Sequence, residues 1–317
     1  MKNFLKHVLT VVLFVCGLIL LLIPVSLLVN PKDNTVDAGM RDISANGILA
    51  EPEQLVDVLI IGDSESYSSF VPLQIYDEYG YTVYICGSPG QQMTYSAEFL
   101  YKTFERHSPK LVILETDCIF HYFSLADVMH IYGDKYFPVF QYHNRWKSLT
   151  ARDFDFTVNY THPDNTKGYW YSTEINEADN PGYMQEAKDS PNITTRNKQF
   201  VQLIKQYCED RGAQLMLISA PSTVNMNMER HQYLTELADE LGLVYVDTNT
   251  LQDEIPIDWT TDTSDAGDHI NYYGARKVTT YLGKYLADTG LLSDHRGDPD
   301  YVSWDEALAA FLERVAE

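Results

Sequence analysis

The stretch Val56-Asp57-Val58-Leu59-Ile60-Ile61-Gly62-Asp63-Ser64-Glu65-Ser66 is an apolar run that ends abruptly in Gly-Asp-Ser. Its β-branched residues predict a buried strand over Val56–Ile61. In an α/β protein, Ser64 would then lie at the carboxyl end of a central strand, where ligand crevices open. We therefore predict that Ser64 is a nucleophile and that most of the remaining chain holds it, activates it or shapes its pocket.

Strand and helix patterns alternate along the chain after this stretch. Apolar runs predict strands at Tyr81–Ile85, Leu111–Leu114, Gln214–Ser219 and Leu243–Asp247. Helical spacing predicts helices at Phe70–Tyr79, Gln92–Glu105, Thr195–Glu209, Glu229–Leu241 and Tyr273–Ala287. This alternation indicates βαβ units and a parallel sheet. Residues 118–194 interrupt it with a stretch rich in Tyr, Phe, Trp, His and Asp, which predicts a long insert of the lid or substrate-loop type.

Composition excludes several functional classes. The 317 residues allow one large domain or two small ones. A formal net charge of -22 argues against nucleic acid as a partner, because phosphates require neutralisation by Lys and Arg. Nucleotide binding lacks support, since neither G-x-x-x-x-G-K-[ST] nor G-x-G-x-x-G occurs. The four cysteines include no C-x-x-C pair, and we predict no metal site and no cofactor.

The N-terminus predicts a membrane anchor. Val8–Val29 contains no charged side chain and is long enough to span a bilayer. Lys2 and Lys6 precede this run, so the positive-inside rule places the short N-terminus in the cytoplasm and the rest of the chain outside. A cleaved signal peptide is the competing interpretation. The run is longer than a signal-peptide core, and no convincing cleavage site follows it, so we favour an uncleaved anchor.

These features predict a domain order along the chain. Residues 1–30 would form a cytoplasmic tip and transmembrane anchor, and residues 31–54 a juxtamembrane linker. Residues 55–290 would form the catalytic domain, including the insert at about 118–194. Residues 291–317 would form a C-terminal tail that ends in a short helix.

A base for Ser64 is found near the end of the chain. A serine hydroxyl needs a base within hydrogen-bond reach, and that base needs an orienting acid. His269 lies in a polar loop just before the last helix of the predicted domain, between Asp265 and Asp268 on one side and Asn271 on the other. A catalytic imidazole requires neighbouring carboxylates of this kind.

The stretch that ends in Ser64 and the loop that carries His269 together resemble the SGNH/GDSL hydrolase superfamily. The G-D-S block of that superfamily matches Gly62-Asp63-Ser64, and its closing D-x-x-H block is similar to Asp265…His269. The resemblance spans roughly residues 56–288 and implies a flavodoxin-like three-layer sandwich with a parallel sheet. Within the superfamily, the chain looks most like membrane-anchored members that resemble the D-alanyl transfer protein of lipoteichoic acid synthesis. The sequence Asp268–Ala275 (DHINYYGA) is the most specific part of the match.

The resemblance implies roles for several residues. Ser64 would be the nucleophile and His269 the general base, while the backbone N–H groups of Ser64 and Gly87 would contribute to an oxyanion hole. The acid of this superfamily normally lies three residues before the histidine, where this chain has Ala266. We favour Asp265, because the small residues Ala266 and Gly267 would let the loop bulge, and Asp268 is the alternative acid.

A second departure concerns the oxyanion hole. The superfamily usually offers an Asn after its third strand, and the matching residue here is Asp117. An ionised carboxylate accepts hydrogen bonds and cannot donate them. The position therefore indicates either an altered acceptor or a weakened activity.

The insert offers candidate substrate contacts. Aromatic platforms with neighbouring polar groups suit a sugar or polyol-phosphate, and the candidates are Tyr142, Trp146, Lys147 and Lys167. A satellite core under a long loop is the competing interpretation of the same residues.

The sequence thus predicts an extracytoplasmic, single-pass serine acyl esterase or acyltransferase. Its substrates would be O-acyl groups of a cell-envelope glycan, a teichoic-acid-like polymer or a small ester, and a membrane acyltransferase would be its partner. The alternative is a non-catalytic envelope protein of the same fold that binds polymer or a membrane partner.

Overall fold

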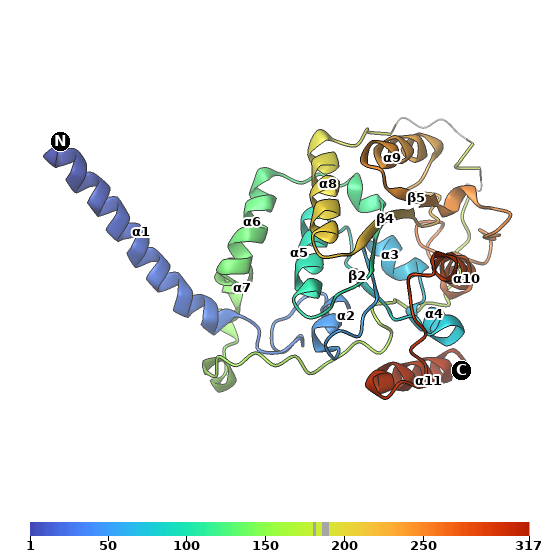
Figure 1. Cartoon of the computed structure of the whole chain (residues 1–317), viewed down its shortest axis with the longest axis horizontal. Helices are drawn as coiled ribbons and strands as arrows, with labels where there is room; N and C mark the ends of the chain where they lie inside the picture. Colours follow the sequence, from blue (N-terminus) through green and yellow to red (C-terminus); the bar gives the residue numbers. More distant parts are fainter. Residues whose placement is uncertain (180–181, 186–189, 317) are drawn as a thin grey trace. The chain divides into compact units, whose positions relative to one another are not determined.

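The computed structural model describes residues 1–179, 182–185 and 190–316 of the chain. They divide into two compact units, residues 1–41 with 124–162, and residues 42–123 with 163–317. We call the first of these unit 1 and the second unit 2, and Figure 1 shows the whole chain.

Unit 2 is built on a five-stranded parallel sheet. Its strands are β1 (Val58–Gly62), β2 (Val83–Gly87), β3 (Leu111–Glu115), β4 (Gln214–Ser219) and β5 (Val244–Asp247). They lie in the order β2-β1-β3-β4-β5, which is the flavodoxin-like order. β1 to β3 are almost wholly buried, as their continuous apolar runs require when helices cover both faces of a sheet. The predicted fold class is therefore confirmed.

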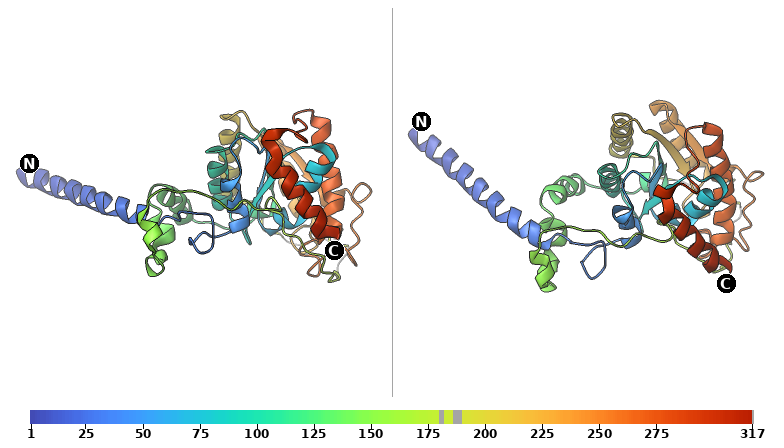
Figure 2. Two further views of the ribbon diagram at one scale, coloured as in Figure 1. Left: turned by 90° about the horizontal axis from the view of Figure 1, so that it is seen from below. Right: turned by 60° about the horizontal axis from the view of Figure 1, so that its bottom comes forward.

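Helices pack on both faces of this sheet (Figures 1 and 2). α5 (Met93–Phe104) packs against α8 (Thr195–Glu209), whereas α3 (Ser64–Ser69) and α4 (Pro72–Tyr79) pack against α10 (Tyr272–Thr289). α9 (Met228–Leu241) lies on β5. All five strands run parallel, so their carboxyl ends lie at the same edge of the sheet. That edge carries Ser64.

The segment before β1 is more ordered than the sequence predicts, whereas the short helix predicted at the end of the C-terminal tail is present. Residues 42–54 were expected to be linker, but α2 (Ile43–Asn46) and η1 (Gly47–Ala50) are partly buried, and the Tyr84 hydroxyl donates to the Ser44 carbonyl (2.8 Å). The C-terminal tail forms η6 (Pro299–Tyr301) and α11 (Val302–Ala316). Trp304 of α11 is fully buried, so the tail belongs to the core of this unit. The apolar residues of 42–54 are too sparse to show a period, which accounts for the difference there.

Unit 1 joins the N-terminal helix to part of the insert. α1 (Lys2–Val29) is long and apolar enough to cross a membrane. The insert portion contains α6 (Leu125–Tyr136), α7 (Val139–Tyr142), η3 (His143–Lys147) and η4 (Ala151–Phe154). The insert predicted at 118–194 is therefore divided between the units, since residues 163–194 belong to unit 2 with η2 (Asp117–Ile119) and η5 (Thr248–Thr250).

Candidate active site

Ser64 is the first residue of α3, directly beyond β1. The Asp63 side chain caps this short helix by accepting a hydrogen bond from the Glu65 backbone N–H (3.3 Å). The Ser66 hydroxyl donates to the Asp63 carbonyl (2.6 Å). These bonds fix the turn between strand and helix, and they hold Ser64 half-buried at the sheet edge.

Gly87 ends β2 beside the Ser64 turn. Gly62 and Gly87 are paired in register, so the two strand ends lie side by side. A Cβ on Gly87 would lie 2.4 Å from Ser66 Oγ and 3.0 Å from the Asp63 carbonyl oxygen. Only glycine permits this approach. The residue that the sequence assigns to the oxyanion hole therefore lies against the turn that carries Ser64.

His269 and Asp265 form a hydrogen-bonded pair. His269 Nδ1 lies 2.5 Å from Asp265 Oδ2, and the His269 backbone N–H donates to Asp265 Oδ1 (2.6 Å). The alternative acid, Asp268, places its Oδ2 3.8 Å from the same ring nitrogen. The geometry favours Asp265 as the residue that orients the imidazole.

The loop between this acid and the histidine bulges as the sequence predicts. Ala266 and Gly267 both have positive φ values, 62° and 94°. The Gly267 carbonyl accepts a hydrogen bond from the Thr223 N–H (2.8 Å), and a Cβ on Gly267 would lie 2.1 Å from Thr223 Oγ1. Two left-handed residues absorb the extra position in the loop, so an acid four residues before the histidine still reaches its ring.

Electrostatics poise this pair for proton transfer. Burial lowers the pKa of His269, but its hydrogen bond to Asp265 and the charges of Glu65, Asp265 and Asp268 outweigh it, so the net shift is upward. Burial raises the pKa of Asp265, but its hydrogen bonds with His269 outweigh burial and lower it. Asp265 is therefore an ionised partner for an imidazolium. The pKa of Asp268 is raised by burial and by the neighbouring carboxylates.

Ser64 and His269 are connected through Glu65. The Ser64 hydroxyl donates to Glu65 Oε2 (3.3 Å). A Glu65 carboxylate oxygen lies within 4.8 Å of a His269 ring nitrogen and of an Asp268 carboxylate oxygen. His269 Nε2 is buried and has no hydrogen-bond partner in the described part of the chain. The resting arrangement thus pairs the serine with Glu65 and leaves the acceptor nitrogen of the imidazole open.

Asn225 joins the same cluster from the loop after β4. Its Nδ2 donates to Glu65 Oε1 and to Asp268 Oδ1, the latter at 2.8 Å. The amide therefore holds two carboxylates beside the serine and the histidine. It also places a neutral hydrogen-bond donor in the site.

Asp117 does not take the place of an oxyanion donor. Arg230 Nη1 donates to Asp117 Oδ1 (2.5 Å), and His121 Nε2 lies 3.1 Å from Asp117 Oδ2. Burial raises the pKa of Asp117, but the hydrogen bond from His121 and the Arg230 charge outweigh it and lower the pKa. An ionised Asp117 between Arg230 and His121 accepts hydrogen bonds only.

Two further carboxyl groups lie beneath Ser64. Burial, followed by the charges of nearby carboxylates, raises the pKa of both Asp63 and Glu115. The Asp117 backbone N–H donates to both carboxylate oxygens of Glu115 (3.1 and 3.2 Å). Protons on these groups, together with Arg230, offset part of the negative charge that the fold gathers here.

Three overlapping groups of side chains have donor atoms close enough to share a metal ion. They are Asp63 with Asp117 and His121, Glu65 with Asp268 and His269, and Asp63 with Glu65 and Glu115. Carboxylate oxygens suit hard divalent cations. Carboxyl groups also cluster in this way without an ion, and protonation and Arg230 already compensate their charge here.

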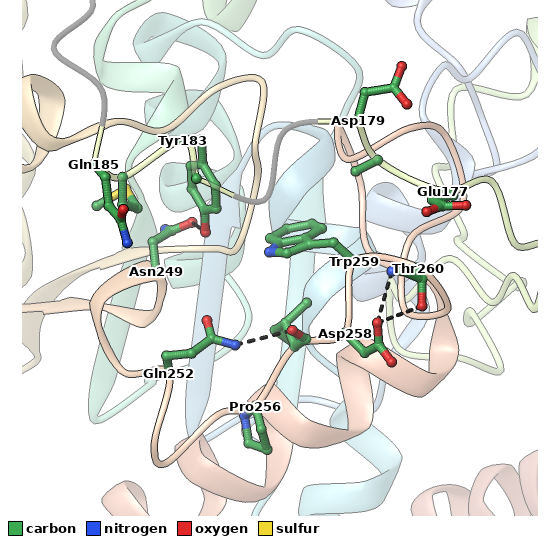
Figure 3. Close-up of a pocket in the computed structure, with 14 residues that line it drawn as sticks. Glu177, Asp179, Tyr183, Gln185, Asn249, Gln252, Pro256, Asp258, Trp259 and Thr260 are labelled. Atoms are coloured by element: carbon green, nitrogen blue, oxygen red, sulfur yellow. Dashed lines mark hydrogen bonds between the residues drawn. The ribbon is translucent and has the colours of Figure 1, made fainter.

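A cavity of ≈ 750 Å³ adjoins the loop that carries His269. Figure 3 shows the rings of Tyr183 and Trp259 beside each other, and they pack edge to face with centroids 5.6 Å apart. The Ala178 N–H donates to the Trp259 carbonyl (3.0 Å), and the Ala266 N–H to the Asn176 carbonyl (2.9 Å). Backbone hydrogen bonds therefore join the cavity wall to the loop that carries His269. The remaining wall is mixed, because amide and carboxylate side chains line it together with apolar residues such as Met184 and Ile257.

The four predicted substrate contacts are not brought together. Tyr142 is buried in unit 1, where Trp146 is exposed with the Lys147 ammonium over its ring. Lys167 is buried in unit 2, and its Nζ donates to Glu51 Oε1 (2.8 Å). The prediction that Lys167 contacts substrate is wrong, because the buried ion pair occupies its ammonium group. Tyr142 likewise presents almost no surface to a polymer.

Sequence reasoning missed Glu65, Asn225 and Arg230 as members of the site. Glu65 directly follows Ser64 in sequence, and Asn225 lies in the loop after a predicted strand, at the edge where ligand crevices open. Position alone could therefore have drawn attention to both. Arg230 lies in the first turn of α9 and reaches the site only through packing.

Comparisons with known proteins give distant structural likenesses only. No protein-family model and no curated protein matches the sequence. A lipase/acylhydrolase from Enterococcus faecalis is 13% identical, with a TM-score of 0.40 over 74% of this chain and 97% of that one. A GDSL-like lipase from Bacteroides thetaiotaomicron is 11% identical, with a TM-score of 0.34 over 73% and 88% of the two chains. The chemistry of the site rests on its own geometry.

Proposed function

We propose that the chain is a membrane-anchored serine acyl esterase or acyltransferase. The Asp265–His269 pair carries this proposal, because its imidazole is oriented by an ionised acid and keeps Nε2 open beside the Ser64–Glu65 contact. Ser64 would leave Glu65 and transfer its proton to His269 Nε2 as Oγ attacks an acyl carbonyl. The imidazolium would then protonate the departing alkoxide, leaving an acyl group on Ser64.

A hydroxyl would resolve this acyl-enzyme. Water gives hydrolysis, and a sugar or polyol hydroxyl gives transfer, with His269 accepting the proton in either case. The cavity beside Trp259 supports a hydroxyl-rich acceptor, because its wall combines an aromatic residue with amide and carboxylate groups. We propose O-acyl groups of a cell-envelope glycan or teichoic-acid-like polymer as the substrate class. Unit 2 would lie outside the membrane, as in the SGNH/GDSL superfamily members that resemble the D-alanyl transfer protein. A membrane acyltransferase would be its partner.

Labelling by a fluorophosphonate probe tests the nucleophile. We expect the purified full-length chain to be labelled and Ser64→Ala to remain unlabelled, because only an activated serine attacks phosphorus. Ser68→Ala is the matched control in the same helix and should be labelled like the wild type. Absence of labelling in the wild type, or labelling of Ser64→Ala, would support the non-catalytic envelope protein instead.

Glu65 should set the pH dependence of the activity. His269 must be neutral to accept a proton, and its pKa is raised, so kcat/KM for p-nitrophenyl acetate should increase with pH through a midpoint above the ordinary histidine value. Glu65→Gln removes one of the charges that raises this pKa and should move the acid limb to lower pH. Glu98→Gln, on α5 beside Lys102, should leave the limb in place. An unchanged limb in Glu65→Gln would refute this coupling.

A further inference from the structure

Unit 1 differs from unit 2 in its charge. Residues 1–41 and 124–162 together contain 8 Lys and Arg and 6 Asp and Glu, whereas the rest of the chain contains 15 and 39. The strong negative charge of the protein therefore belongs entirely to unit 2. A bilayer surface with anionic lipids would repel unit 2 but would not repel unit 1.

The insert portion of unit 1 packs on the carboxyl end of the apolar helix. Arg145 Nη1 donates to the Val29 carbonyl (2.7 Å), and the same guanidinium is paired with Asp153 (2.6 Å). The Val139 N–H donates to the Ser26 hydroxyl (3.4 Å). The bond from Arg145 satisfies a carbonyl at the end of α1 that lacks a partner within the helix. Wherever α1 ends in a membrane, the residues bonded to that end, Val139 and Arg145, lie at the same level.

Large apolar side chains are exposed on the same residues. The aromatic members, exposed by 47% to 70%, are Tyr136, Phe140, Trp146, Phe154 and Phe156. A cationic side chain accompanies them, since Lys147 Nζ lies 5.7 Å from the Trp146 ring centroid. Aromatic rings with an apolar body, mixed with Lys and Arg, are typical of the interface between acyl chains and headgroups.

We propose that residues 124–162 form a membrane-interface collar, which rests on the headgroups of the bilayer that α1 crosses. The occupant of this surface follows from continuity, because the segment is bonded to the end of the span itself. The proposal rests on the anchoring role proposed for α1 and is independent of the esterase chemistry. It also gives the exposed aromatic residues of the insert a partner other than a polymer.

Quenching by brominated lipid tests the collar in the full-length protein. The chain would be reconstituted into phosphatidylcholine–phosphatidylglycerol vesicles that contain phosphatidylcholine brominated high on its acyl chains. Trp146 is 65% exposed on the collar and Trp170 is 48% exposed on unit 2, while Trp259 and Trp304 are buried. We expect quenching of the wild-type tryptophan fluorescence, loss of most of that quenching in Trp146→Phe, and its retention in Trp170→Phe.

The outcomes separate the collar from the anchor. Equal quenching of the wild type and Trp146→Phe would overturn the collar, as would loss of the quenching in Trp170→Phe alone. Extraction of the vesicles with alkaline carbonate reports on α1 separately, because a spanning chain stays in the membrane fraction. Because Trp146 is exposed, Trp146→Phe should keep the near-ultraviolet circular dichroism of the folded chain apart from the contribution of that indole.

Discussion

Asp265→Asn should lower kcat for p-nitrophenyl acetate by roughly 10⁴-fold, with a much smaller change in KM. The Asp265 carboxylate accepts the Nδ1–H of His269 and so fixes the tautomer that exposes Nε2 as a proton acceptor. An amide in its place can present its N–H₂ group to Nδ1, which stabilises the wrong tautomer. It also removes the negative charge that stabilises the imidazolium formed during attack. Steady-state kinetics of the purified variant would measure the loss.

Asp268→Asn is the matched control for this substitution. Asp268 lies in the same loop but 3.8 Å from His269 Nδ1, and its carboxylate accepts a hydrogen bond from Asn225 instead. We expect a modest loss of activity and a lower pKa for His269, since one neighbouring negative charge disappears. If Asp268→Asn were the more damaging of the two changes, the assignment of the acid would have to be reversed.

The elements of unit 2 were predictable because burial leaves periodic patterns. β4 and α8 begin and end at the predicted residues, since apolar side chains recur there at strand and helix spacing. α6 was not predictable by the same rule. Its residues Leu125, Met129 and Tyr136 are exposed, so the helix has no clear face toward a core. A sequence pattern that reflects burial does not predict a helix whose apolar side chains are exposed.

The residues of the site also divide into those that the sequence pattern predicts and those that it does not. The positions of Ser64 and His269 were predictable, because a serine after a strand and a histidine in a polar loop before a helix leave a sequence signature. The choice of Asp265 depended on the backbone of Ala266, which no side-chain pattern encodes. Glu65 and Asn225 meet over 160 residues of sequence. Contacts of that separation depend on the packed sheet, so single-sequence reasoning had no access to them.

Lys167→Met should lower the free energy of unfolding by about 3–5 kcal/mol, the cost expected for removing one partner of a buried ion pair. Glu51 is fully buried, and the Lys167 ammonium lies 2.8 Å from its Oε1 and 4.7 Å from the centroid of the Trp304 ring. Methionine fills a similar volume but leaves the carboxylate without its cation. Urea unfolding of the full-length chain in detergent, followed by fluorescence, would measure the change.

The loss should depend on pH with a defined sign. Burial raises the pKa of Glu51 in the folded chain even with Lys167 present, and removal of the cation raises it further. The folded variant then binds a proton more tightly than the unfolded chain, so its stability falls as pH rises above the unfolded pKa of Glu51 and recovers in acid. Glu51→Gln combined with Lys167→Met should restore much of the stability at neutral pH. Lys110→Met, which removes a 40% exposed partner of Asp57, should cost no more than about 1 kcal/mol. A loss in Lys167→Met no greater than that of Lys110→Met, or one that grows in acid, would contradict the buried pair.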